Sequence, residues 1–178
     1  MTTAQKFRGR RTATAAAIAL LAVGMTGCSA VNLQATTMQY SASDGIVFNV
    51  ADAQLRNMML VTGAEGEPAR LIGSIVNDTD KSISVELTVD GNSTTVDVPK
   101  KTSLKLEDDA NKVVLPSAGA APGSHVEATV TSGGNSVSES MPIVNGALPA
   151  YRPFIPSGYD ESTVEHLQPT EPILEPEK

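Results

Sequence analysis

The chain has 178 residues, with 13 basic and 20 acidic side chains, no tryptophan and a single cysteine, Cys28. All four charged residues before Cys28 are basic, so the chain from Cys28 onward carries 9 − 20 = −11 charges. This acidity argues against nucleic-acid binding because such a surface repels phosphate backbones. A lone cysteine leaves no internal disulfide to stabilise the fold, and the length suits one ordinary domain.

Residues 1–27 have the pattern of a secretory signal peptide. A basic start precedes an apolar run over 13–23, which is shorter than the roughly 20 residues that a membrane-spanning helix needs. The run ends in Met-Thr-Gly-Cys at 25–28, which resembles the lipobox of bacterial lipoproteins. That resemblance implies cleavage before Cys28 and a covalent lipid with palmitate-type acyl chains on its sulfur. We therefore expect a lipid-anchored protein on the extracytoplasmic face of the cell membrane, rather than a freely secreted protein or an uncleaved signal anchor.

Residues 28–43 are small and polar and show no sustained period, which is typical of a flexible tether. A tether of this length has an end-to-end distance of about 20 Å. Residues 44–144 then show the apolar alternation of short strands separated by Gly, Pro, Asn and Asp turns. We predict an all-β domain, an antiparallel immunoglobulin-like or cupredoxin-like β-sandwich without a disulfide. The predicted strands are 46–50, 53–62, 70–77, 83–89, a strand ending at Val98, 102–106, 113–115, one around 126–131, and 136–141.

Residues 145–178 form an extended, proline-rich tail that is acidic from Asp160 onward. Its prolines and like charges predict a segment that is partly docked or disordered. Tyr151, Phe154 and Tyr159 are three of the few aromatic residues in the chain. They either pack back onto the sandwich or anchor a partner protein, because large rigid rings dominate interface energetics.

No catalytic motif occurs, and we expect no enzymatic activity. His125 and His166 have no histidine or cysteine partner at metal-ligand spacing, and we expect both at the surface. Acidic clusters at 78–80 and 107–109 lack the spacing of a calcium loop, and turns that cap their own backbone explain the first of them. We therefore expect no resident metal or cofactor besides the lipid on Cys28.

Methionine gives a second, copper-handling hypothesis because thioethers are soft ligands for Cu(I). Its ligands would come from Met38, Met58, Met59, Met141 and His125. Adjacent residues of a strand face opposite sides, however, so Met58 and Met59 could share a metal only across a bulge. Methionine is also a common filler of aromatic-poor cores.

Together, five features resemble small actinobacterial lipoproteins of the LpqE type. They are the lipobox, the segments 55–61 and 69–79, the Pro-Gly turn at 122–123, and Tyr-Arg-Pro-Phe at 151–154. The resemblance implies a β-sandwich distantly similar to the periplasmic copper chaperones of the PCu(A)C kind. It does not carry over their copper site, since Ser136 stands where their motif places a methionine after a histidine.

Our main hypothesis is a non-catalytic accessory or binding subunit of a membrane protein complex. The resemblance implies that this complex is the cytochrome bc–aa3 respiratory supercomplex, contacted on its outer face. Tyr151, Phe154 and Tyr159 are the candidate contact residues, and the acylated Cys28 is the membrane contact. The alternatives are copper handling and a module that binds a small ligand or the cell wall, which would show a lined pocket.

Overall fold

The computed structural model describes residues 42–167. The predicted signal peptide, Cys28, nearly all of the tether and the end of the acidic tail lie outside these residues. Nine strands hold about half of the described residues. They are β1 (Ile46–Val50), β2 (Ala53–Val61), β3 (Ala69–Asn77), β4 (Ile83–Val89), β5 (Asn92–Val98), β6 (Thr102–Lys105), β7 (Val113–Leu115), β8 (His125–Ser132) and β9 (Asn135–Val144). Three short 3-10 helices are η2 (Asp109–Asn111), η3 (Arg152–Phe154) and η4 (Glu161–Leu167).

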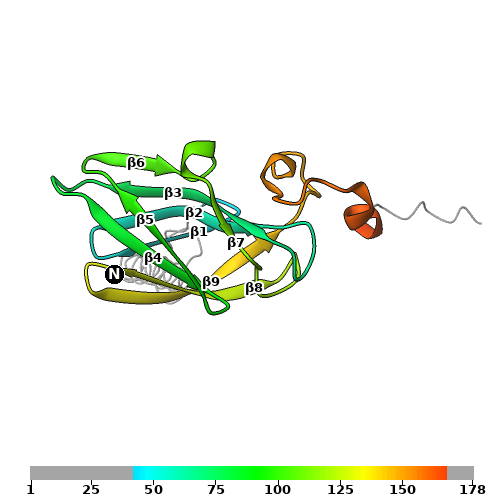
Figure 1. Cartoon of the computed structure of the whole chain (residues 1–178), viewed down its shortest axis with the longest axis horizontal. Coiled ribbons are helices and arrows are strands. Elements are labelled where there is room, and N and C mark those ends of the chain that lie inside the picture. Colours follow the sequence, from blue (N-terminus) through cyan, green and yellow to red (C-terminus); the bar gives the residue numbers. More distant parts are fainter. Residues whose placement is uncertain (1–41, 168–178) are drawn as a thin grey trace, which may run out of the picture. The chain divides into compact units, whose positions relative to one another are not determined.

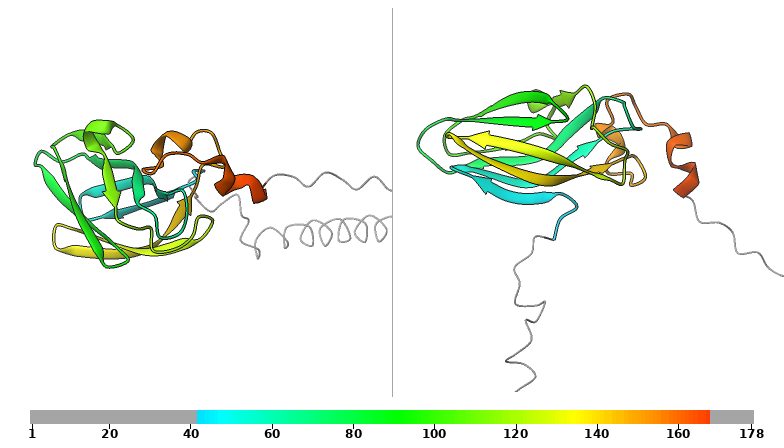
Figure 2. Two further views of the ribbon diagram at one scale, coloured as in Figure 1. Left: turned by 45° about the vertical axis from the view of Figure 1, so that its right-hand side comes forward. Right: turned by 90° about the horizontal axis from the view of Figure 1, so that it is seen from below.

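The strands form two layers that are joined through β9 (Figures 1 and 2). One layer has the order β5-β4-β8-β9, and the other places β1, β6 and β7 around the pair β2-β3. β9 pairs antiparallel with β8 along most of its length and parallel with β2 at its last two residues, Ile143 and Val144. This parallel pairing is the one departure from an antiparallel arrangement among the described strands. The all-β sandwich predicted from the sequence is confirmed.

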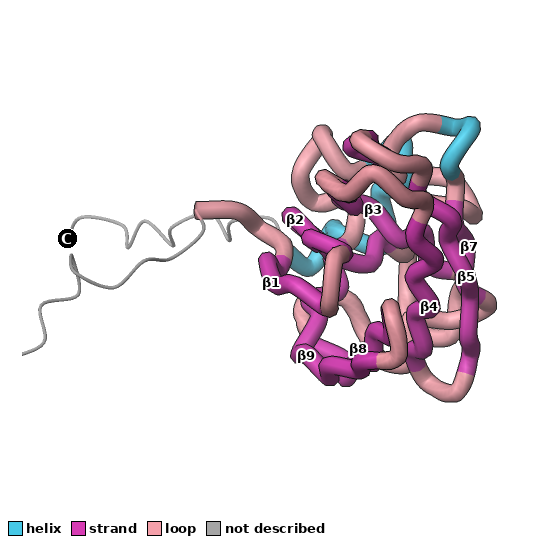
Figure 3. The backbone as a smooth tube through the Cα atoms, turned by 90° about the vertical axis from the view of Figure 1, so that its left-hand side faces the viewer, coloured by secondary structure: helices cyan, strands magenta, loops and turns pink. Residues whose placement is uncertain are grey.

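The main core lies between the two layers, and Figure 3 shows the strands around it. The alternation predicted for β4 holds: Val85, Leu87 and Val89 are buried while Ser84 and Glu86 are exposed. The same alternation turns one face of β5, β8 and β9 inward. The bounds predicted for β1, β4 and β7 coincide with the observed ones, and the others differ by at most three residues, because hydrophobic alternation marks the paired core of a strand better than its ends.

A bulge interrupts the pairing of β2 with β3. Asn57 and Met58 together oppose the single residue Gly73. Asn57 has a positive φ of 54° and Gly73 one of 121°, and a Cβ on Gly73 would lie 2.7 Å from the Asn57 carbonyl oxygen. The Asn57 side chain is fixed by the Gly45 N–H, which donates to its Oδ1 at 2.9 Å. Only glycine fits this approach, so the bulge is built into the sequence.

The bulge resets which residues of β2 face the main core. Leu55 faces it before the bulge, and Met58 and Leu60 face it afterwards. Met59 and Val61 therefore turn to the opposite face, where they join Ile72 of β3 in a second, smaller core. Met58 and Met59 lie on opposite faces, as the geometry of a strand predicts.

Replacing Leu55 by alanine should lower the free energy of unfolding by about 2–5 kcal/mol, because the side chain is fully buried and its removal leaves a cavity. Val47→Ala is the matched control in the neighbouring strand β1, where the side chain is 37% exposed. It should change stability by less than about 0.5 kcal/mol. Chemical denaturation followed by circular dichroism measures both, and equal losses would contradict this assignment of the core.

Candidate functional site

The proline-rich residues 145–159, here called the strap, cover the second core. Tyr151, Phe154 and Tyr159 are half-buried and pack with Ile155 against that core. The strap follows β9 and lies beside the end of the sandwich, drawn in orange in Figure 1. The aromatic residues thus fasten this segment to its own domain.

Arg70 is the main fixing point of the strap on the sandwich side. Its side chain is 4% exposed, and its guanidinium lies 5.1 Å from the centre of the Phe154 ring. Nη2 donates to the carbonyl oxygens of Leu106 at 3.3 Å and Glu107 at 2.7 Å, while Nη1 lies 3.4 Å from Asp109 Oδ1. A buried cation is tolerated only with such partners, and the aromatic face adds a cation–π contact.

A second arginine stiffens the strap internally. The Arg152 guanidinium lies 4.2 Å from the centre of the Tyr159 ring, and its Nε donates to the Gly146 carbonyl oxygen at 2.9 Å. A Cβ on Gly146 would stand 2.4 Å from the Tyr159 ring. Glycine at 146 is therefore required by the close approach of this ring.

Tyr151 ties the strap to the place where the tether enters the domain. Its hydroxyl donates to Asp44 Oδ2, just before β1 begins. Burial, the hydrogen bond to Asp44 and the charge of Asp44 raise the pKa of Tyr151 to about 12. The strap is thus linked to residues that lie more than a hundred positions earlier in the chain.

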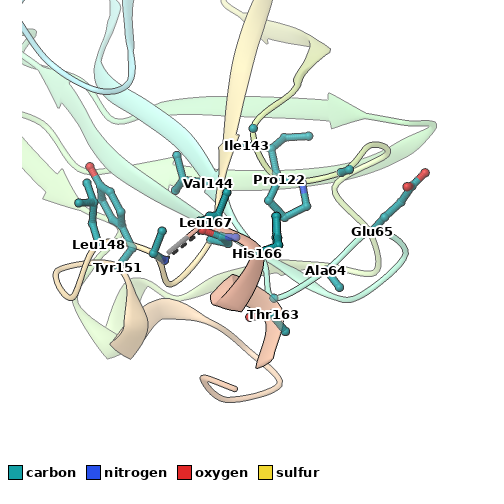
Figure 4. Close-up of a pocket in the computed structure, with 15 residues that line it drawn as sticks. Ala64, Glu65, Pro122, Ile143, Val144, Leu148, Tyr151, Thr163, His166 and Leu167 are labelled. Atoms are coloured by element: carbon teal, nitrogen blue, oxygen red, sulfur yellow. Dashed lines mark hydrogen bonds between the residues drawn. The ribbon is translucent and has the colours of Figure 1, made fainter. Parts of the chain in front are cut away.

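An apolar pocket of about 530 Å³ opens beside the strap (Figure 4). Five segments line it: the loop after β2, the loop before β8, the end of β9, the strap and η4. Leu148 and Leu167 contribute to it while remaining 56% and 54% exposed. His166, expected only at the surface, is exposed and also lines this pocket. Sequence analysis missed the pocket because no single segment of the five carries a recognisable motif.

The two acidic clusters take part in separate local contacts. Asn77 Oδ1 accepts hydrogen bonds from the Thr79 backbone and hydroxyl, which is the predicted turn, while Asp80 pairs with Lys101 at 3.5 Å. In the other cluster, Glu107 Oε1 accepts from the Gly73 N–H at 3.2 Å. Among residues 42–167, no three His, Cys, Asp or Glu side chains are grouped to hold a metal ion.

The structure does not bring the proposed copper ligands together. Met58 and Met141 are buried in the main core, Met59 lies in the second core, and His125 is exposed at the start of β8. Met38 lies outside the described residues. Within the described range, no helix has the length and apolar character to cross a membrane.

No family model and no curated protein matches the sequence. Solved structures with a similar backbone include the apo PCuAC domain from PmoF1, with 17% identity and a TM-score of 0.45, covering 56% of this chain and 99% of that domain. The copper-bound PCuAC domain from PmoF2 has 15% identity and a TM-score of 0.43, covering 56% and 98%. The apo PmoF2 PCuAC domain has 15% identity and a TM-score of 0.44, covering 58% and 98%. At these values no ligand or activity passes from those proteins to this one.

The raised pKa of Tyr151 predicts a specific loss of stability in alkali. A phenol whose pKa is higher in the folded state stabilises the fold below its unfolded pKa of about 10. That contribution should disappear as the pH rises from about 10 to about 12. In absorbance titrations of tyrosinate, Tyr151→Phe should remove the component that titrates near pH 12. If Tyr151→Phe instead removes a tyrosinate component that titrates near pH 10, the hydrogen bond of Tyr151 to Asp44 would be contradicted.

Proposed function

We propose that this chain is a non-catalytic, lipid-anchored accessory subunit of a membrane protein complex on the extracytoplasmic face. The lipobox-like sequence at Cys28 supports the anchor. The resemblance to LpqE-type lipoproteins suggests the cytochrome bc–aa3 supercomplex as the complex. The observation that carries the proposal is the fixed strap, because it presents the acidic helix η4 from a defined position.

η4 is held at its start and in its middle. Tyr159 stacks on Arg152, Asp160 Oδ1 accepts the Ser162 N–H at 2.9 Å, and Val164 is buried. The hydrogen bonds from Ser162 lower the pKa of Asp160, so this carboxylate stays charged. Asp160, Glu161 and Glu165 are all exposed. A fixed group of carboxylates favours a basic partner surface, since complementary charge steers association and sets orientation.

This arrangement changes the role of the three aromatic candidates. Tyr151, Phe154 and Tyr159 hold the strap against the sandwich, and the exposed acids of η4 are the proposed contact. Deleting residues 151–178 is therefore a poor test of docking, because it would uncover Met59 and Val61 of the second core. Surface substitutions on η4 avoid that problem.

The structure bears differently on the two alternatives, copper handling and the binding of a small ligand or the cell wall. Copper handling would need Met58, Met59, Met141 and His125 to meet, and they lie in two cores and at an exposed strand end. Cu(I) retained through dialysis against a moderate chelator would favour copper handling over docking. Binding of a small ligand is favoured by the pocket beside the strap.

The anchor is tested by Cys28→Ala in the full chain. The variant should move from the membrane fraction to the soluble extracytoplasmic fraction, because two or more acyl chains are what hold the protein stably on a bilayer. Immunoblots of fractionated cells measure the change, with Ser29→Ala as the matched control. A Cys28→Ala chain that loses its signal peptide and still stays in the membrane fraction would contradict lipid anchoring.

Docking is tested by reversing charges on η4. Glu161→Lys with Glu165→Lys should reduce the haem-containing complex that co-purifies with the chain, and the wild-type association should weaken as salt is added. Glu86→Lys with Asp97→Lys makes the same charge change on exposed residues of β4 and β5. An affinity tag in the exposed Gly133-Gly134 turn keeps the carboxyl end free. Equal co-purification of both variants and wild type would contradict docking through η4.

A further inference from the structure

The pocket beside the strap has the size and chemistry of a binding site for an apolar chain. Its volume of about 530 Å³ lies within the range of roughly 300–1,000 Å³ usual for ligand pockets. Pro122, Ile143 and Val144 are among its apolar lining residues. Figure 4 shows Leu167 and His166 between Tyr151 on one side and Pro122 on the other. A few polar groups, including Asn145 and Thr163, complete the lining.

The tether enters the domain next to this pocket. Asp44 accepts the hydroxyl hydrogen bond of Tyr151, and Tyr151 itself lines the pocket. Cys28 stands 44 − 28 = 16 residues before Asp44. That length spans about 50 Å when extended and has an end-to-end distance of about 22 Å as a flexible chain. A group attached to Cys28 therefore reaches the pocket with an effective concentration in the millimolar range.

We propose that the pocket binds one acyl chain of the lipid carried by Cys28. The proposal rests on the lipid-anchor part of the proposed function and is independent of docking through η4. The apolar wall takes the hydrocarbon, and the exposed Leu148 and Leu167 extend the apolar surface beyond it. Lipid anchoring and pocket binding then compete for the same acyl chain, so the pocket regulates how firmly the protein is held on the membrane.

The charges around the pocket favour the attached acyl chain over one drawn from the bilayer. Glu65 lines the pocket, and Asp44 lies against Tyr151. These carboxylates repel anionic headgroups, so pressing this end of the domain onto an anionic bilayer is unfavourable. An acyl chain delivered by the tether reaches the pocket without such an approach.

The capacity of the pocket is measured with the mature chain carrying Cys28→Ser, which removes the attached lipid. The probe is cis-parinaric acid, a naturally fluorescent long-chain fatty acid. We expect one molecule to bind per chain, and Ala147→Trp to weaken binding by at least about tenfold, because Ala147 lines the pocket. Ala110→Trp, on the exposed helix η2, is the matched control and should not change binding. Absence of binding to the Cys28→Ser chain overturns the proposal.

Occupancy by the attached acyl chain is measured by hydrogen exchange on the lipidated chain in lipid nanodiscs. Amides of the segment 163–167 should exchange at least about tenfold more slowly than in the Cys28→Ser chain, and Ala147→Trp should remove this protection. Exchange that is equal in the two chains overturns the proposal. Equal protection of the Cys28→Ser chain by added nanodiscs also overturns it, because the occupant is then a bilayer lipid.

The mass of the amino-terminal peptide separates failure of the anchor from failure of the pocket. An unacylated Cys28 overturns both the lipid anchor and the occupant proposed here, even if parinaric acid binds. An acylated Cys28 without protection at 163–167 overturns the pocket proposal alone and leaves the anchor intact.

Discussion

The extra residue in β2 is the constraint on which the second half of the structure depends. Two residues of β2, Asn57 and Met58, lie opposite the single residue Gly73 of β3. From Met58 onward, the positions of β2 that face the main core and those that face away from it are therefore exchanged. Met59 and Val61 then face outward beside Ile72 and form an apolar patch on that face. That patch must be covered, and the strap covers it. The bulge, the strap and the pocket beside it therefore form one causal sequence.

Arg70 makes the covering segment specific as well as apolar. An apolar patch alone could be covered by many different segments. The buried guanidinium of Arg70, in contrast, restricts the geometry of the segment that packs over it. Its Nη2 donates to the carbonyls of Leu106 and Glu107 and its Nη1 to Asp109, which leaves the face of the guanidinium for a flat ring. Phe154 supplies that ring. Removing Phe154 would leave this cation without its aromatic partner, which costs more than the lost apolar contact.

The sandwich could be predicted from the sequence because its strands obey a local rule. In β4, for example, Val85, Leu87 and Val89 alternate with polar residues, and one period suffices to assign a half-buried strand. The second core could not be assigned in this way, although the sequence does hold a trace of it. Residues 58–61 of β2 form an apolar run without alternation, and Leu71 and Ile72 are adjacent apolar residues of β3, which indicates burial on both faces. The outer face of β2 and β3 is covered by the strap, which follows about eighty to a hundred residues later in the chain. No local sequence pattern indicates such a distant contact.

The pocket was still less accessible to prediction, because its lining is a consequence of where the strap ends. The strap brings Leu148 and Tyr151 to the same end of the sandwich as Pro122 and Val144, and η4 adds Leu167 from the other side. The Tyr151–Asp44 hydrogen bond places the arrival of the tether at that end as well. The start of the described chain, at Asp44, and its last described helix, η4, thus both lie beside one apolar pocket. Thr163, His166 and Leu167 of η4 line the pocket. An acyl chain bound there would therefore touch the same helix that carries the proposed acidic contact, so each event should influence the other directly through η4.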